Sequence, residues 1–362
     1  MSRQRRPHKK SRDGCAQCKE RHIRCDEVRP QCLNCKRLVI HCSFSSPTLG
    51  TMPLNGDSLA DFELLDYWYR HPLIPGSLEL DRELKHGYVR LGISHPYLLN
   101  SILALMSLRR FVEDRCYTSW YTRAVAHQQA AISRARPHLQ RLDRSQHKAI
   151  IAFSTFTSLY AVAEPLHRPT SFSHDHSDFD PIEEFIHGIR LSRGTTAFIQ
   201  QHLRSVVTSD AFMATKYSSN GLEVACGLEA QFPQLLTLRN AIQGMYGDEQ
   251  RAVCLDAVER LFTCMKILLG NPGNNRHIMV IFAWAKEVDS ILFDMCSARH
   301  PVALVILAHF AALMSLNQGF WLLQHWPAVL LRYIRDRLKD WEDLLRWPTE
   351  IIFRNNSIPH FA

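Results

Sequence analysis

Six cysteines near the start of the chain follow a spacing that repeats once, and this repeat constrains the fold of that segment more than any other feature. Each half reads x2 and then x6, in the order Cys15-x2-Cys18-x6-Cys25-x6-Cys32-x2-Cys35-x6-Cys42. Two intervening residues let both thiolates of a Cys-x2-Cys pair face one tetrahedral zinc ion. The spacing therefore predicts metal binding by sulfur.

The number of sulfurs also predicts how many ions are bound. Six sulfurs complete two four-coordinate ions only if two of them are shared. The repeat makes the first cysteine of each half, Cys15 and Cys32, the natural bridge. We therefore expect two Zn²⁺ ions with a structural role, because sulfur fills every coordination position and leaves none for a substrate.

A disulfide knot or two separate half-sites are the alternatives for these cysteines. Both are disfavoured, because the spacings repeat without error and the basic start of the chain is not followed by the apolar segment of a secretory signal. A reduced intracellular compartment is expected, where clustered cysteines indicate metal. The remaining cysteines are interpreted as buried apolar side chains in helices: Cys116, Cys226, Cys254, Cys264 and Cys296.

The excess positive charge lies at one end of the chain. The net charge is +8, and residues 1–46 alone hold 12 Lys+Arg against 4 Asp+Glu, so the remainder is neutral. Such a basic arm beside a cysteine framework favours nucleic acid over a membrane surface as the partner. The arm, which includes Lys10 and Arg12, is interpreted both as a nuclear localisation signal and as a source of phosphate contacts.

The composition divides the chain into three segments. Residues 1–45 are the basic, cysteine-rich module, residues 46–56 have linker composition, and residues 57–362 have successive helical patterns. We find no convincing period-two strand pattern, so the predicted fold class is all-α, a small two-zinc module followed by a large helical domain. No membrane span is expected, since the longest apolar run, 301–314, is too short and contains His309.

Apolar residues in the large segment recur at helical spacing. The first helix is expected after Asp57, with Phe62, Leu65 and Tyr69 along it. Single helices are also expected over residues 277–295 and 326–345. Five aromatic side chains are interpreted as core: Trp120, Phe153, Phe156, Trp321 and Trp326. The polar stretch 165–179 is expected to be a loop, where a metal site at His174 and His176 is weighed against an ordinary solvated loop.

The stretch KSRDGCAQCKERHIRCDEVRPQCLNCKRLVIHCSF closely resembles the fungal zinc binuclear cluster family. The resemblance implies two zinc ions, with the first and fourth cysteines bridging. It also implies that a helix after the second cysteine enters the major groove of double-stranded DNA, typically at CGG triplets. Carried over by position, Lys19, Arg21, His22 and Arg24 occupy the basic positions of this helix, and Arg12 and Lys10 precede it.

Three residues depart from the family pattern. His22 stands where relatives usually carry the Lys or Arg that reads bases, and it lacks that charge-assisted contact to guanine. Glu20 places an acid on a helix that is normally free of one. Val39 stands where Gly is frequent. The first two departures imply weaker affinity or an altered sequence preference.

The large segment resembles the regulatory domain of fungal regulators related to the sterol uptake control proteins. The resemblance is carried by DFELLDYW (61–68), ISHPYLLNSILALMSL (93–108), RLSRG (190–194), HPVALVILAHFAALM (300–314) and WPAVLL (326–331). It implies a helical regulatory domain, which in sterol-sensing members holds an apolar ligand in a pocket. The competing interpretation is that these aromatic and apolar side chains are simply core.

Together the two resemblances imply a sequence-specific transcription factor in the nucleus, acting on RNA polymerase II genes of a biosynthetic gene cluster or of sterol and lipid metabolism. The alternative is a small-molecule sensor whose helical domain binds a sterol-like ligand and gates DNA binding. An enzyme is least favoured, because the chain shows no phosphate loop, dinucleotide fingerprint, HExxH or nucleophile elbow. Residues 43–57 are too short for a coiled coil, so dimerisation, if any, is expected through the helical domain.

Overall fold

The computed structural model contains helices joined by turns, with no strand among the residues it describes. The predicted all-α fold class is therefore confirmed. The chain divides into two compact units, Met1–Phe62 and Glu63–Ala362. The limits predicted from composition, 1–45, 46–56 and 57–362, stay a prediction. The structure describes residues 13–28, 31–38, 40, 42–45, 56–73, 78–140, 143–169, 179–202, 233–245, 247–270, 277–316 and 320–355.

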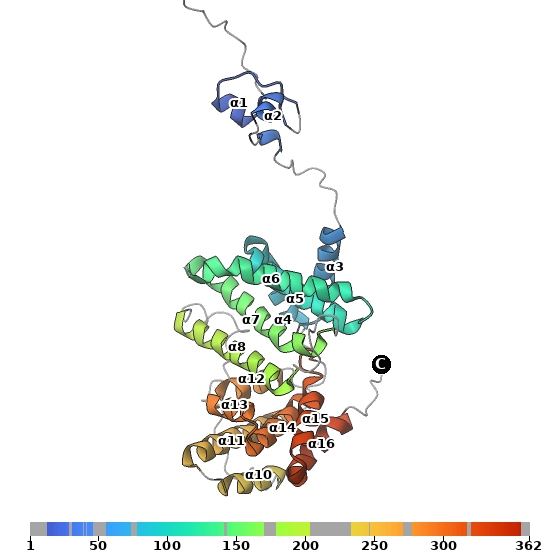
Figure 1. The fold of residues 1–362 in the computed structure, drawn as a ribbon, viewed down its shortest axis with the longest axis vertical. Helices are drawn as coiled ribbons and strands as arrows, with labels where there is room; N and C mark the ends of the chain where they lie inside the picture. The colour runs from blue at the N-terminus through green and yellow to red at the C-terminus, as the bar shows by residue number, and fades with distance from the viewer. Residues whose placement is uncertain are drawn as a thin grey trace, which may run out of the picture. The chain divides into compact units, whose positions relative to one another are not determined.

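Two short helices and one 3-10 turn make up the described part of the first unit (Figure 1). They are α1 (Ala16–Glu20), α2 (Leu33–Arg37) and η1 (Ser43–Ser45). Helices of this length are not stable alone, because nucleation costs more than so few backbone hydrogen bonds contribute. Each is anchored at its start by sulfur: the amide of Cys18 donates to Cys15 Sγ and that of Cys35 donates to Cys32 Sγ, both at 3.4 Å.

Both short helices also end with the same backbone bond. The amide of Ile23 donates to the Cys18 carbonyl, and the amide of Ile40 donates to the Cys35 carbonyl, each at 3.1 Å. This bond belongs to the Schellman motif, in which the residue after the cap is left-handed. His22 fills that position in α1, with φ 54°. The repeat in the sequence is therefore a repeat in the backbone structure.

The second unit is a stack of amphipathic helices. Its elements are α3 (Gly56–Arg70, which crosses the division between the units), α4 (Leu78–Ser94), α5 (Pro96–Glu113), α6 (Thr118–Gln140), η2 (Arg144–Gln146), α7 (His147–Ala163), η3 (Glu164–His167), α8 (Pro181–His202), α10 (Pro233–Gln243), α11 (Asp248–Gly270), α12 (His277–Glu287), α13 (Ser290–Ser297), α14 (Pro301–Ser315), α15 (Trp326–Arg337), η7 (Lys339–Trp341) and α16 (Glu342–Asn355). In Figure 1, α4–α7 lie at one end and α10–α16 at the other, with α8 between them. Consistent with this, α8 contacts α7, α12, α13 and α15.

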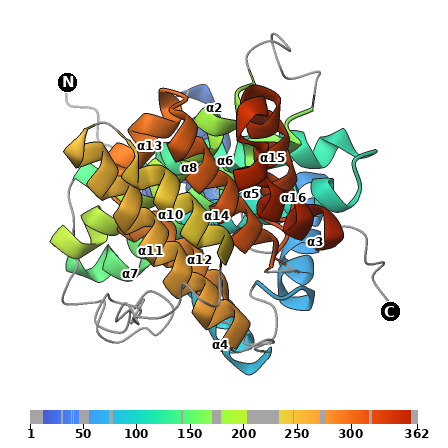
Figure 2. The ribbon, with the colours of Figure 1, turned by 90° about the horizontal axis from the view of Figure 1, so that it is seen from below.

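Helix α14 lies at the centre of the end of the helical unit that contains α10–α16. Every side chain from Val302 to Met314 is buried, and the neighbours include α11, α13, α15 and α16. Figure 2 shows α14 with α11, α12, α15 and α16 around it. A helix that is apolar on all sides needs such a position, because every face must be covered.

One stretch, His147–His167, is long and apolar enough to cross a membrane by length and composition. Within the helical unit, 61% of its apolar window is buried. The core helix of a soluble protein passes the same test, so this stretch is weak evidence for a span.

Three of the five predicted core aromatics, Phe153, Phe156 and Trp326, are buried, and Trp120 and Trp321 pack partly buried against the same core.

The helix predicted over 277–295 is in fact two helices. It ends at Glu287 and resumes at Ser290. The carboxylate of Asp289 caps the second helix by accepting the Ile291 amide at 2.9 Å. Arg193, from α8, donates to the Val288 carbonyl at the end of the first. The break is thus stabilised by a side chain that is distant in sequence, which periodicity does not reveal.

The helix predicted over 326–345 is also broken, at Leu338, where η7 separates α15 from α16. The first part is held at its start by Trp326, whose indole Nε1 donates to the Val162 carbonyl of α7 at 2.8 Å. Both residues are buried. This hydrogen bond satisfies a polar group inside the core and joins two helices far apart in the chain.

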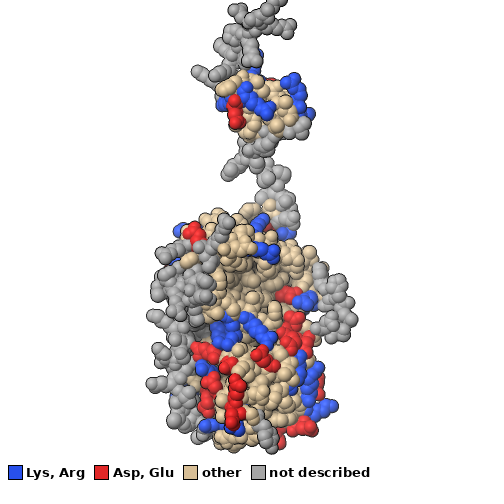
Figure 3. All heavy atoms as spheres, turned by 60° about the vertical axis from the view of Figure 1, so that its left-hand side comes forward, with Lys and Arg blue, Asp and Glu red and all other residues tan. Residues whose placement is uncertain are grey.

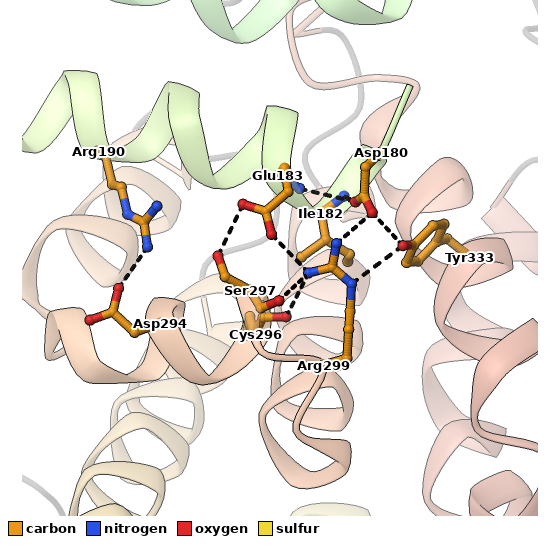
Figure 4. A network of polar contacts seen from close by, with 9 residues as sticks. All are labelled: Asp180, Ile182, Glu183, Arg190, Asp294, Cys296, Ser297, Arg299 and Tyr333. Carbon is orange, nitrogen blue, oxygen red and sulfur yellow. Dashed lines mark hydrogen bonds and ion pairs between the residues drawn. The ribbon is translucent and has the colours of Figure 1, made fainter. Parts of the chain in front are cut away.

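A sharp elbow joins α13 to α14, whose axes differ by 110°. Arg299 at the elbow is left-handed, with φ 60°, a conformation that is costly for a residue with a Cβ. Figure 4 shows its guanidinium held by Asp180 and Glu183 of the α8 start, with Tyr333 of α15 hydrogen-bonded to the same aspartate. Burial raises the pKa of Asp180, but hydrogen bonds from Tyr333, from the Glu183 amide and from Arg299 outweigh it and lower that pKa. The network ties the elbow to two other helices.

Candidate metal centre and nucleic-acid interface

The six cysteines of the repeat form the core of the first unit. All are free thiols, and all are at least 97% buried. The distances Cys15 Sγ to Cys32 Sγ, Cys15 Sγ to Cys35 Sγ and Cys18 Sγ to Cys32 Sγ are each 3.7 Å. A disulfide requires about 2.05 Å, so these sulfurs are packed against one another without being bonded.

The sulfur spacing fits zinc. A tetrahedral ion with Zn–S bonds of about 2.3 Å places its ligands about 3.8 Å apart. The observed 3.7 Å matches this edge length. The four sulfurs of Cys15, Cys18, Cys32 and Cys35 all lie within 4.8 Å of one another. The donor set therefore has the chemistry and the spacing of a zinc–thiolate cluster.

Neighbour relations among the sulfurs divide the cluster into two groups. The Cys18 thiol interacts with the thiols of Cys15, Cys25 and Cys32. The Cys35 thiol interacts with those of Cys15, Cys32 and Cys42. Cys15 and Cys32 belong to both groups, and the other four cysteines belong to one group each. This is the arrangement that two tetrahedra with one shared edge require.

Without a cation, the thiols of Cys18 and Cys35 hold their protons, whereas at Cys42 hydrogen bonds outweigh burial and lower the pKa to about 7. Burial, together with hydrogen bonds with Cys32 and Cys15, raises the pKa of the Cys35 thiol to about 12. Burial likewise raises the pKa of Cys18. Zinc binds thiolates, so loading the cluster releases protons and couples metal affinity to pH.

The side chains predicted to contact DNA are exposed around the end of α1. Lys19 is the one basic residue within the helix, which ends at Glu20. The placement of Arg21, His22 and Arg24 on the same helix is wrong: Arg21 is its C-cap and the other two follow it. The Schellman turn ends the helix early, because the backbone must return to Cys25. All four basic-position side chains and Glu20 are exposed.

The basic arm lies outside the described residues, so Lys10 and Arg12 stay predictions, as does the loop containing His174 and His176. On the surface of the first unit, Figure 3 shows Lys and Arg side chains with an acidic group beside them. The face of the helical unit in the same view carries acidic and basic side chains interleaved.

Sequence reasoning missed two side chains that join the halves of the cluster. Ser43 Oγ accepts the Ala16 amide at 2.8 Å. Each carboxylate oxygen of Asp26 lies 3.1 Å from the Leu33 amide and accepts its hydrogen bond. Both acceptors follow directly after the third cysteine of their half, and both donors follow directly after the first cysteine of the other half. This shared position was the signal in the sequence.

The helical unit has a mainly apolar pocket between α7, α8, α12 and α14, whose lining includes Val162, Phe185 and Phe310 and also the polar residues Ser192 and Lys286. Its cavity volume is about 20 Å³, enough for about one water molecule. Drug-sized ligands occupy roughly 300–1,000 Å³. A larger cleft of about 330 Å³ along α15 and α16 is lined by charged and polar residues. Among the described residues, neither feature fits a sterol-sized apolar ligand.

Comparison with known proteins places the cysteine repeat in a known domain. Residues 13–50 match the fungal Zn(2)-Cys(6) binuclear cluster domain, which binds two zinc ions. A Zn(2)-C6 fungal-type transcription factor from Gibberella zeae is 58% identical over 43 residues, 12% of this chain and 9% of that protein. Sterol uptake control protein 2 from Candida albicans is 50% identical over 40 residues, 11% of this chain and 6% of that protein.

A longer match is to the transcriptional regulatory protein moc3 of Schizosaccharomyces pombe, 34% identical over 70 residues, which is 19% of this chain and 14% of that protein. No solved structure matches the chain. These relatives are matched over a small part of their length, and the matches cover 11% to 19% of this chain. The spacing, the packed sulfurs and the domain match agree, and the chain carries a fungal Zn(2)-Cys(6) binuclear cluster domain at residues 13–50.

Proposed function

We propose that this protein is a sequence-specific, DNA-binding transcription regulator that acts in the nucleus. The observation that carries the proposal is the zinc-cluster geometry, which presents exposed basic side chains at the end of α1. The related proteins are named as transcription factors or regulators, which favours this role over catalysis.

In this proposal all six cysteines are zinc ligands. Cys18 and Cys25 belong to one ion, Cys35 and Cys42 to the other, and Cys15 and Cys32 to both. The zinc ions supply the cross-links that so small a unit needs in order to fold. The side chains of the protein then recognise the DNA sequence. Burial of the sulfurs fixes the short helix, and the helix and the turn that follows it hold the exposed basic residues toward the major groove.

The proposed contacts with DNA are of two kinds: contacts with phosphates, which position the protein, and contacts with base edges, which recognise the sequence. Lys19, Arg21 and Arg24 contribute positive charge for phosphates and donors for the acceptor edge of guanine. His22 hydrogen-bonds a base edge in place of the Lys or Arg that usually stands at this position. Exposed Glu20 repels phosphate, which weakens non-specific binding more than specific binding. Lys10 and Arg12 extend the same basic surface along the DNA backbone.

The helical unit is the regulatory part in this proposal. Its pocket of about 20 Å³ supports a regulator with a filled core over a sensor of a sterol-sized ligand. Regulation of a biosynthetic gene cluster or of sterol metabolism rests on resemblance, which includes the match to Sterol uptake control protein 2.

Selection from a random DNA library tests the proposal. The zinc-loaded full chain should enrich one short motif related to a CGG triplet. A Cys32→Ser chain serves as the control and should enrich none. Zinc-loaded protein with two ions per chain that enriches no motif would overturn the proposal.

A further inference from the structure

The start of each short helix in the zinc unit is capped from the opposite half of the repeat. The Ala16 amide, at the first position of α1, donates to Ser43 Oγ at 2.8 Å. The Leu33 amide, at the first position of α2, donates to Asp26. Amides in the first turn have no partner within the helix. These two bonds therefore satisfy equivalent groups in an equivalent way.

The cap on α1 is reinforced by a second bond. The Ser43 amide donates to Gln17 Oε1 at 2.8 Å, so Ser43 makes one hydrogen bond to Ala16 and one to Gln17 across the unit. At the equivalent position in α2, the side-chain amide of Asn34 donates to the Arg24 carbonyl at 2.8 Å. Each helix is thus held at its first turn by the chain that flanks the third cysteine of the other half.

The two caps differ in charge. Ser43 presents a neutral hydroxyl to α1, while Asp26 presents a carboxylate to α2. A carboxylate interacts more favourably than a hydroxyl with a helix start, because the helix dipole places partial positive charge there. However, a helix of five residues is only about 7.5 Å long, which is shorter than the Debye length of about 8 Å at physiological ionic strength. A carboxylate at the start of α1 would therefore act on phosphates bound near Lys19 at its end.

We infer that Ser43 is a positioning residue for DNA reading: its neutral hydroxyl caps α1 in the orientation that presents Lys19 and Arg21, without placing a negative charge beside the DNA. The inference rests on the proposed DNA-binding function. Without the cap, the first turn of α1 frays in the free protein, and DNA binding must order it again. Gln17 shares this role, because its side chain holds Ser43 and is not available for bases.

Four variants of the full chain test the inference, each compared at two bound zinc ions per chain. Ser43→Ala removes the cap and should weaken DNA binding about five-fold. Ser43→Thr keeps the hydroxyl and should bind within about two-fold of the parent. Ser43→Asp keeps an acceptor but adds charge, so it should bind more weakly than Ser43→Ala at low salt and approach it at high salt.

Asp26→Ala is the matched control, because it removes the equivalent cap from α2. Its DNA affinity should not fall. The Co²⁺-substituted absorption spectrum should be the same in all four variants, which separates positioning from loss of the metal site. Unchanged DNA affinity in Ser43→Ala, an equal loss in Asp26→Ala, or a loss accompanied by zinc release would overturn the inference. Failure of the parent protein to bind DNA would instead reject the proposed function.

Discussion

Cys15 Sγ lies 3.7 Å from Cys32 Sγ, although 16 residues separate the two cysteines in the chain. Each is the first cysteine of its half, and each also approaches a sulfur of the opposite half at 3.7 Å. The pair is therefore the link between the two halves of the cluster. The other four cysteines each belong to one of the two groups of neighbouring sulfurs.

Loss of a shared cysteine should affect both ions at once. We expect native mass spectrometry to find two zinc ions in the parent chain and none in Cys15→Ser or Cys32→Ser. Cys18→Ser, which removes a sulfur from one ion only, should retain the other ion. A parent chain with one zinc ion or with three disulfides would contradict the assignment, as would equal zinc loss in all three variants.

His22 is a test of base reading. Its left-handed backbone, φ 54°, also suits glycine, so His22→Gly removes the imidazole while keeping the turn. His22→Lys should tighten DNA binding by about 1–3 kcal/mol through one added phosphate or guanine contact and restore preference for a CGG-like triplet. His22→Gly should not. If His22→Lys and the parent bind with equal affinity and select the same motif, His22 lies outside the interface.

Gly188 permits close contact between α7 and α8. A Cβ at this position would lie 2.8 Å from Val162 Cγ2 and 3.3 Å from Val162 Cα. Gly188→Ala should therefore destabilise the helical unit by about 1–3 kcal/mol. Gly87 in α4 is the control, because nothing lies within 4 Å of its added Cβ. Gly87→Ala should stabilise the unit by up to about 1 kcal/mol, since alanine favours a helix.

Chemical denaturation of the two glycine variants measures both effects. The difference between the two changes in the free energy of unfolding is more informative than either change alone, because both substitutions restrict the unfolded chain equally. Destabilisation by Gly87→Ala, or no effect of Gly188→Ala, would show that the helices adjust more freely than the close approach to Val162 indicates.

The helical unit should lose stability in mild acid because of His309. This side chain is buried in α14, donates from Nδ1 to the Val305 carbonyl and stacks on Trp347. Burial lowers its pKa to about 4 from 6.5. A histidine with a lowered folded-state pKa stabilises the fold above its unfolded pKa, and that stability is lost as pH falls toward the folded value. The shift corresponds to about 3 kcal/mol.

Denaturation of the parent and of His309→Gln at pH 7 and pH 5 measures this dependence. Glutamine does not titrate, so the variant should lose less stability between the two pH values. A residual loss is expected from His167, whose pKa is lowered by burial and then by Arg115 and His325. Equal acid sensitivity in parent and variant would show that protonation of His309 is not coupled to unfolding.

The sequence alone determined the metal centre. Thiolate chemistry and chain geometry leave few ways to place six cysteines at a repeated x2 and x6 spacing, so counting predicts two zinc ions, which the domain match supports. The shared role of Cys15 and Cys32 follows from the same count and stays a prediction. The all-α class followed in the same way, because periodic burial is a local property of the chain.

The tertiary structure decided everything that depends on partners distant in sequence. Periodicity placed Phe62 and Tyr69 along α3, but these are exposed, while Leu64 and Trp68 are buried, because the position of the neighbouring helices selects the face. The break near Val288 depends on Arg193, some 95 residues away. The cap on α1 depends on Ser43, which lies beyond all six cysteines. Hydrogen bonds across such separations form only once the fold has brought the segments together, and the periodicity of apolar residues therefore cannot predict them.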